Sequence, residues 1–231
     1  MSTAPASNIV ERSDLRNQLW VFRDREHAGE VLAQMLAEYR GSEALVMGIP
    51  AGGVPVGAVI ARTLDLPLDI AVVSKITPPW NPEYGYGALA WDGTVLLNQE
   101  ALPYLQLSER DMTEGIERAR AKVERRVKSL RGDRPFPQVA GRTVILADDG
   151  IATGVTTEGA IDALVKMQAD RLVLATPTGH EEAVRRLAQK VEKVYCANLR
   201  GGGSFAVAQA YQYWSDMSDA EIAEILKKFM P

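Results

Sequence analysis

Short apolar runs alternate with amphipathic segments along most of the chain. The run ALVMG at 44–48 precedes a helical pattern in VPVGAVIARTLD, and later apolar runs are followed by similar segments. Continuous apolar runs are typical of strands that are buried on both faces. There are five such runs, at 44–48, 68–74, 143–147, 171–176 and 192–197. Strands separated by helices predict an α/β fold with a parallel sheet of about five strands, flanked by helices.

One long helix is expected between the second and third of these strands. Ser108 and Asp111 have the spacing of a capping box, and apolar residues recur at helical spacing from about 108 to 130. The opposite face of this helix is strongly basic over 118–131. A solvated charged face is the favoured interpretation of that run, over a binding patch.

The alternation breaks in the segment KITPPWNPEYGYGALAWDGTVLLN, which carries three prolines. Its second half is typical of a hairpin that turns at Asp92 and Gly93. We interpret 76–105 as an insertion that forms a small hood and a flexible lid within one domain spanning 1–231. Its aromatic residues could stack on a base, but burial against the core is slightly favoured. These residues are Trp80, Tyr84, Tyr86 and Trp91.

Composition narrows the classes of function. The 231 residues are 46% hydrophobic, enough for one sizeable core. A formal charge of -4 argues against nucleic-acid binding through a broad basic face. The single cysteine, Cys196, excludes a disulfide framework and is expected to be a buried, inert thiol. No run has the length of a membrane span and no secretory signal is evident, so we expect a cytoplasmic protein without a membrane partner.

The stretch VILADDGIATGVTT at 144–157 carries the strongest chemical signal. Asp148 and Asp149 follow an apolar strand, and ligands of parallel sheets bind beyond the carboxyl ends of strands. The loop that follows enters a helix, whose free N–H groups favour an anion. Two carboxylates can accept hydrogen bonds from a cis-diol, stabilise positive charge and organise Mg2+. These features together predict a sugar phosphate as the ligand.

The same stretch resembles the ribose-5-phosphate signature of type I phosphoribosyltransferases. MGIPAGGVPVGAVIA resembles the pyrophosphate loop of that family. VVSKITPPWNPEYGYGALAWDG resembles a segment of a poorly characterised branch of predicted phosphoribosyltransferases, and so do both ends of the chain. The resemblance therefore covers nearly the whole sequence.

This resemblance implies an enzyme that uses 5-phosphoribosyl 1-pyrophosphate with Mg2+ and transfers the phosphoribosyl group to a nitrogen nucleophile, such as a nucleobase, with release of pyrophosphate. Asp148 and Asp149 would hold the ribose hydroxyls and, directly or through water, the metal. Lys75 would be the catalytic cation at the leaving group. The 5-phosphate would be cradled by Gly150, Ile151, Ala152, Thr153, Gly154, Val155, Thr156 and Thr157. The pyrophosphate would be bound by Ala51, Gly52 and Gly53 together with Lys75. A homodimer is also expected.

Two departures from the resembled pattern bear on activity. Ala51 stands where the branch usually has Arg, which removes a bidentate clamp on pyrophosphate unless another cation, such as Lys75 or Arg200, replaces it. Ala152 stands where 6-oxopurine enzymes carry an acidic residue, which argues against hypoxanthine or guanine as the acceptor. The resemblance to type I phosphoribosyltransferases also implies a strained or cis peptide near Ala51 and Gly52.

Other interpretations stay open at this stage. The same fold could bind phosphoribosyl pyrophosphate or a nucleotide as a regulatory signal without turning it over. An ordinary dinucleotide-binding oxidoreductase is disfavoured, because no Gly-x-Gly-x-x-Gly follows the first strand. Glu83 could be a base or a metal partner, although a surface carboxylate is favoured. The loop at 199–205 could line the acceptor pocket or be only a turn.

Overall fold

The central sheet has six parallel strands in the order β1-β9-β8-β7-β2-β3. In this computed structural model, residues 8–82 and 84–229 are described. The strands are β1 (Ile9–Glu11), β2 (Leu45–Gly48), β3 (Leu68–Ile70), β7 (Thr143–Ala147), β8 (Arg171–His180) and β9 (Lys193–Arg200). The predicted α/β fold with a parallel sheet is thus confirmed.

The strand count and one boundary differ from the prediction. β1 was not anticipated, because its three half-buried residues form no continuous apolar run at the edge of the sheet. The predicted strand at 68–74 splits in two. β3 stays in the central sheet, and β4 (Val73–Ile76) begins a second sheet after the buried pair Ala71 and Val72. Burial is continuous across the break, so the apolar pattern does not mark it.

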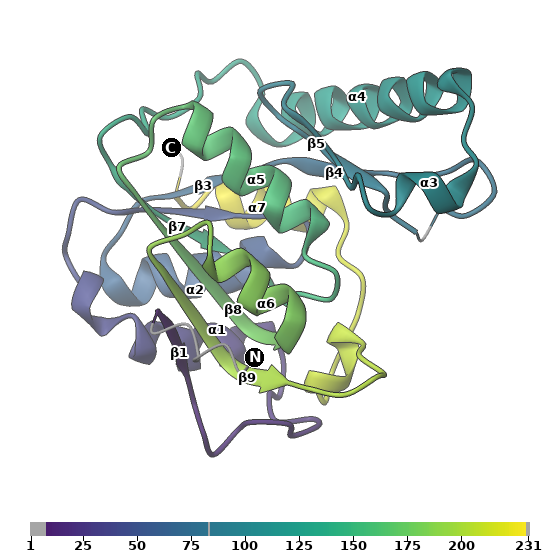
Figure 1. The fold of residues 1–231 in the computed structure, drawn as a ribbon. Helices are drawn as coiled ribbons and strands as arrows, with labels where there is room; N and C mark the ends of the chain where they lie inside the picture. The colour runs from purple at the N-terminus through teal and green to yellow at the C-terminus, as the bar shows by residue number, and fades with distance from the viewer. Residues whose placement is uncertain (1–7, 83, 230–231) are drawn as a thin grey trace.

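Helices cover both faces of the central sheet (Figure 1). One core layer contains the apolar sides of α1 (Arg25–Met35) and α2 (Gly53–Leu64), with α7 (Asp219–Leu226) packed nearby. The other contains those of α5 (Val155–Lys166) and α6 (Glu181–Ala188). Short helical turns complete the connections: η1 (Ala37–Tyr39), α3 (Leu102–Leu105) and η2 (Val207–Ala210).

The insertion forms a second, antiparallel sheet in the order β4-β5-β6. β5 (Gly87–Ala90) and β6 (Val95–Leu97) form the predicted hairpin, with Gly93 at a φ of +84° in the turn. The expected burial of aromatic residues is confirmed for Tyr86, and Trp91 is half-buried and stacks on Phe136. It is wrong for Trp80 and Tyr84, which are exposed on the loop between β4 and β5.

The long helix α4 (Glu109–Arg131) lies alongside this second sheet (Figure 1). Its predicted capping box is present. The Ser108 hydroxyl accepts from the Asp111 N–H, and the Asp111 carboxylate accepts from the Ser108 N–H. α4 also packs against α7, so it bridges the insertion and the end of the chain. This placement brings one side of α4 to the carboxyl end of the central sheet.

Candidate active site

Two loops from neighbouring strands meet at the carboxyl edge of the sheet. β2 pairs with β7, with Gly48 opposite Ala147, so the segments that follow these strands emerge side by side. The Ile49 N–H donates to the Ala147 carbonyl at 2.9 Å. A Cβ at Gly53 would lie 2.4 Å from the same carbonyl oxygen, so only glycine fits. The structure therefore brings the predicted pyrophosphate loop against the predicted aspartate pair.

Asp148 is buried without a cationic partner among the described residues. One carboxylate oxygen accepts from the Asp149 N–H at 2.9 Å, and the other accepts from the Thr157 hydroxyl at 3.2 Å. Burial, and then the charge of Asp149, raise the pKa of Asp148 well above its usual range. A ligand that brings hydrogen-bond donors or positive charge would stabilise the ionised form of such a carboxylate.

Asp149 lies between a loop and an arginine. Its Oδ2 accepts from Arg25 Nε at 2.8 Å, at the start of α1. Burial raises the pKa of Asp149, and the Arg25 charge opposes that rise. A Cβ at Gly52 would lie 1.6 Å from the same carboxylate oxygen, so Gly52 leaves the space that Asp149 occupies.

Arg25 is a site residue that the sequence interpretation missed. Its guanidinium lies 4.0 Å from the ring centroid of Trp214 and donates to the Ser215 carbonyl at 2.8 Å. Tyr211 donates its hydroxyl hydrogen to the Asp149 backbone carbonyl at 2.5 Å. No local pattern links these residues to the aspartate pair, because both ends of the chain reach the site only in the folded state.

The predicted phosphate loop connects β7 to α5. Gly154 precedes α5 with a φ of +75°, a conformation that favours glycine, and no side chain caps the helix. Ile151 is buried and anchors the loop, since its N–H donates to the Thr178 carbonyl and its carbonyl accepts from the His180 N–H. The first-turn N–H groups of α5 are thus placed to receive an anion.

The side chains of this loop divide into two groups. Ala152 and Thr153 are exposed, and Thr156 is half-buried and lines a cavity beside α4. Thr157 is buried and donates to Asp148. Its hydroxyl therefore orients the Asp148 carboxylate and does not face the open side of the loop. The sequence predicted that the Thr157 hydroxyl donates a hydrogen bond to the phosphate. In the structure α5 turns this side chain toward the end of β7, where it donates to Asp148 instead.

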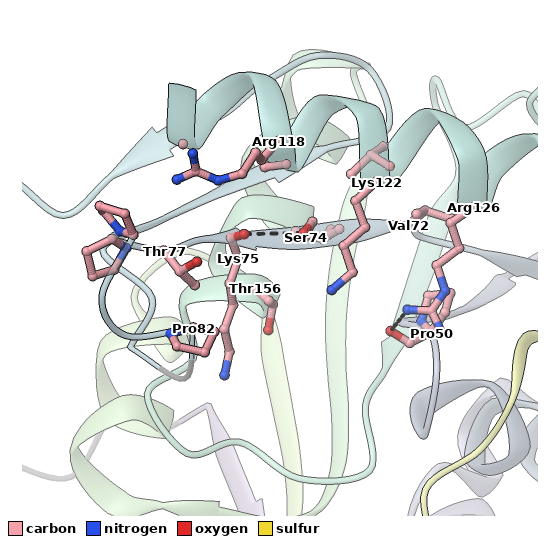
Figure 2. Close-up of a pocket in the computed structure, with 16 residues that line it drawn as sticks. Pro50, Val72, Ser74, Lys75, Thr77, Pro82, Arg118, Lys122, Arg126 and Thr156 are labelled. Atoms are coloured by element: carbon pink, nitrogen blue, oxygen red, sulfur yellow. Dashed lines mark hydrogen bonds between the residues drawn. The ribbon is translucent and has the colours of Figure 1, made fainter. Parts of the chain in front are cut away.

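Lys75 stands between two cavities on the same side of the sheet. A cavity of about 570 Å³ is lined by Lys75, Pro50 and Thr156 together with α4. Figure 2 shows Lys75 extending into it from β4. A second cavity of about 540 Å³ is lined by Lys75 and the phosphate-loop residues 152, 153 and 155. Lys75 therefore lies near both loops that were predicted to bind anions.

Other predicted residues have clear positions. The cis peptide lies between Pro50 and Ala51, one bond earlier than expected. Arg200 is buried and donates to the Gln209 side chain at 2.9 Å, so its guanidinium is engaged near its own loop rather than in the cavity with Lys75. Glycines 201–203 are exposed beside it. Glu83 lies outside the described residues.

The donor set fits a metal ion that brings its own ligands. Within 8–82 and 84–229, no group of three or more His, Cys, Asp or Glu side chains could hold a metal ion. Mg2+ is commonly bound by one or two carboxylates with water and substrate phosphates. The Asp148–Asp149 pair would supply these two carboxylates, and the remaining ligands would come from water and the substrate. In the same ranges, none of the helices has the length and apolar character needed to cross a membrane.

Comparisons with known proteins agree with this geometry. The family described as "Phosphoribosyl transferase domain" matches residues 24–198. Two curated proteins from strains of Mycobacterium tuberculosis, both named "Putative phosphoribosyl transferase", are 36% identical over 90% of this chain. The chain spans about half of their length, 47%. The crystal structure of TT1426 from Thermus thermophilus matches with a TM-score of 0.73 and 34% identity, over 90% of this chain and 98% of that one.

Proposed function

The chain belongs to the phosphoribosyl transferase domain family, and from this premise we propose that it is a glycosyltransferase acting on 5-phosphoribosyl 1-pyrophosphate with Mg2+. The acceptor is a nitrogen nucleophile, a nucleobase or a similar compound, and pyrophosphate is released. One observation carries the proposal. An aspartate pair, the buried Asp148 and the partly buried Asp149, lies between a loop that needs Gly52 and Gly53 and the uncapped start of α5.

The phosphate end of the donor fits the loop 150–157. Free N–H groups at the start of α5 and the side chain of Thr156 would face an anion bound there. The helix dipole adds only about 0.3–1 kcal/mol. Several charge-assisted hydrogen bonds, at about 1.5–3 kcal/mol each, are what make such a site effective.

The ribose fits the two carboxylates. Their oxygens accept hydrogen bonds from the 2- and 3-hydroxyls, which partly offsets the unfavourable burial of Asp148. In the reaction the bond between C1 and the pyrophosphoryl oxygen breaks with its electron pair on oxygen. The nucleophile's nitrogen bonds to C1 and releases its proton to solvent. Positive charge that develops on the sugar is stabilised by the adjacent carboxylates.

Mg2+ bound with the donor would lie against Asp148 and Asp149 and neutralise phosphate charge. Lys75 adds a cation from β4 on the leaving-group side. The Gly53 N–H already donates to the Ile49 carbonyl at 3.0 Å, so within the predicted pyrophosphate loop the backbone N–H groups offered to pyrophosphate are those of Ala51 and Gly52. We further expect a cytoplasmic homodimer without nucleic-acid partners, consistent with the charge of -4.

A second function is favoured by one contact. Arg25 already occupies Asp149 Oδ2, and Ala51 supplies no cation to the donor. A protein of this kind could bind phosphoribosyl pyrophosphate or a nucleotide as a regulatory signal and leave it intact. The two functions make the same demand on the phosphate loop and differ only in turnover.

The experiment that separates them measures pyrophosphate release from the Mg2+–donor complex across a panel of nucleobases and amines. The enzyme function predicts release that depends on one class of acceptor. Asp148→Asn with Asp149→Asn should retain the fold and lower turnover by at least about 10²-fold, the scale of losing a preorganised charge. Donor binding without release for any acceptor supports the regulatory function. Absence of donor binding contradicts both.

A further inference from the structure

One face of α4 carries three cations at four-residue spacing. Arg118, Lys122 and Arg126 recur every helical turn, and all three line the cavity of about 570 Å³ (Figure 2). At 1.5 Å per residue they extend over about 12 Å. Lys75 faces them from β4. Arg118 and Lys122 are exposed, as expected for a solvated basic face, and they also line a cavity at the carboxyl edge of the central sheet.

The charge of this cavity is not balanced by its own walls. No Asp or Glu side chain lines it among the described residues. Lys75 and Lys122 form no ion pair in the described part of the chain, and Arg118 has only a 3.9 Å contact with Glu114 on its own helix. Repulsion between cations on one helix face is unfavourable. An arrangement of this kind is relieved when a multiply charged anion enters.

The cavity borders the two loops that are proposed to bind the phosphoribosyl pyrophosphate donor. Pro50, which lines it, immediately precedes Ala51, and Arg126 donates to the Pro50 carbonyl at 3.3 Å. Asp219 on α7 fixes Arg126 with an ion pair at 2.7 Å. Thr156 reaches the same space from the phosphate loop. A ligand that spans both loops therefore has its second anionic group within reach of α4.

We propose that α4 is the cation source for the pyrophosphoryl group of the donor and for the pyrophosphate released, in place of the side chain that Ala51 lacks. Arg118 and Lys122 contact the pyrophosphoryl oxygens opposite Lys75, and Arg126 positions the loop through Pro50. This inference rests on the proposed function and assigns its leaving-group site. The negative charge left on oxygen when the bond to C1 breaks is stabilised by these side chains.

The test compares two charge-matched double variants of the full chain. R118Q/K122Q removes two cations from the cavity, and R125Q/K128Q removes two exposed cations of α4 that do not line it. Calorimetric titrations use Mg2+–pyrophosphate, the Mg2+–phosphoribosyl pyrophosphate donor and ribose 5-phosphate. Thermal unfolding shows whether each variant is folded, and the single variant K122Q replaces the double if R118Q/K122Q is not.

We expect R118Q/K122Q to weaken binding of pyrophosphate and of the intact donor about tenfold or more, the scale of a lost charge-assisted pair. Ribose 5-phosphate should bind all folded variants alike, and R125Q/K128Q should match the wild type with every ligand. Equal pyrophosphate affinity in the wild type and R118Q/K122Q, or no pyrophosphate binding by the wild type, overturns the inference. Failure of the wild type to bind ribose 5-phosphate instead contradicts the proposed function.

Discussion

Arg25 Nε lies 2.8 Å from Asp149 Oδ2, an ion pair that joins residues 124 positions apart. The arginine is held on its other side by Trp214 and by the Ser215 carbonyl. Asp149 in turn lies directly over Gly52. The carboxylate predicted to bind ribose thus lies between the predicted pyrophosphate loop and the Arg25 cation of α1. The same two neighbours therefore influence both its position and its charge.

Replacing Arg25 with Met should shift the pH dependence of donor binding. Met keeps apolar contact with Trp214 but removes the charge that opposes the rise in the pKa of Asp149. The carboxylate is then protonated at higher pH, so ribose 5-phosphate affinity should be lost at a higher pH than in the wild type. Above that range the variant should bind at least as tightly, because Asp149 no longer has a competing partner.

Calorimetric titration between about pH 5 and about pH 8 measures this shift. Titration of the ligand's own phosphate is common to both proteins and cancels in the comparison. R62M is the control, since Arg62 forms only an exposed ion pair with Glu26. Superimposable pH profiles for the wild type and R25M would show that Arg25 does not govern the charge of Asp149.

Asp148→Asn should stabilise the protein at neutral pH while it weakens function. Burial raises the pKa of Asp148 in the folded state, so the folded protein binds this proton more tightly than the unfolded chain. The contribution to stability therefore falls as pH rises from the unfolded pKa to the raised folded pKa, and stays low above it. Asn avoids this loss and can still accept from the Asp149 N–H.

Thermal unfolding at several pH values measures the effect. Each kcal/mol added to the free energy of unfolding should raise Tm by about 2–4 °C for a chain of this size. The gain should disappear below about pH 4, where the aspartate is protonated in both states. The exposed Asp133 supplies the control variant D133N, which should leave Tm unchanged. A lower Tm for D148N at neutral pH would contradict the prediction.

Local signals in the sequence were sufficient for part of this structure. The capping box of Ser108 and Asp111 and the turn at Asp92 and Gly93 depend on neighbouring residues alone, and both are found as predicted. The nearness of the aspartate pair to Gly52 follows from topology, because parallel neighbours end at the same edge.

Long-range packing decided the rest. Arg25 reaches Asp149 only because α1 packs on α2, and no spacing in the sequence encodes that contact. The basic spacing of α4 was visible, but whether it faces water or a cavity depends on the second sheet that β4 begins. β1 was missed because edge pairing through the backbone leaves no apolar run.

Gly52→Ala should displace Asp149 and reduce donor binding. The new methyl group would lie 1.6 Å from the carboxylate oxygen, so either Asp149 or the loop must move. Moving the carboxylate also breaks its pair with Arg25. We expect turnover to fall about 10²-fold or more, since a misplaced charge stabilises the transition state poorly.

Steady-state pyrophosphate release measures this loss. G203A is the matched control, because a Cβ at Gly203 meets no atom within 4 Å. That variant should retain wild-type activity. Full activity in G52A would show that Asp149 need not occupy the position observed here.

The insertion should close over the bound donor, and amide exchange is the direct measurement. Proline-rich segments and glycines separate its rigid parts, and its loop borders the cavity that contains Lys75. Exchange in 77–82 and 84–86 should slow when Mg2+ and phosphoribosyl pyrophosphate bind, because closure excludes water from C1. The buried residues of β7 should show no change. Unchanged exchange in the insertion at saturating donor would make it a static cover.

Ala51→Arg should tighten donor binding strongly only when α4 has lost its cations. In R118Q/K122Q the new guanidinium restores a charge-assisted pair of about 1.5–3 kcal/mol, which is roughly tenfold or more in affinity. If α4 supplies the cations as proposed, the pyrophosphoryl group in the wild type already has Lys75, Arg118 and Lys122 around it, so the gain should be less than about threefold. Calorimetric titration of the Mg2+–donor complex into all four proteins gives the coupling between position 51 and α4. Equal gains in both backgrounds would mean that the two sources of charge act on different parts of the donor, and α4 would not replace the missing arginine.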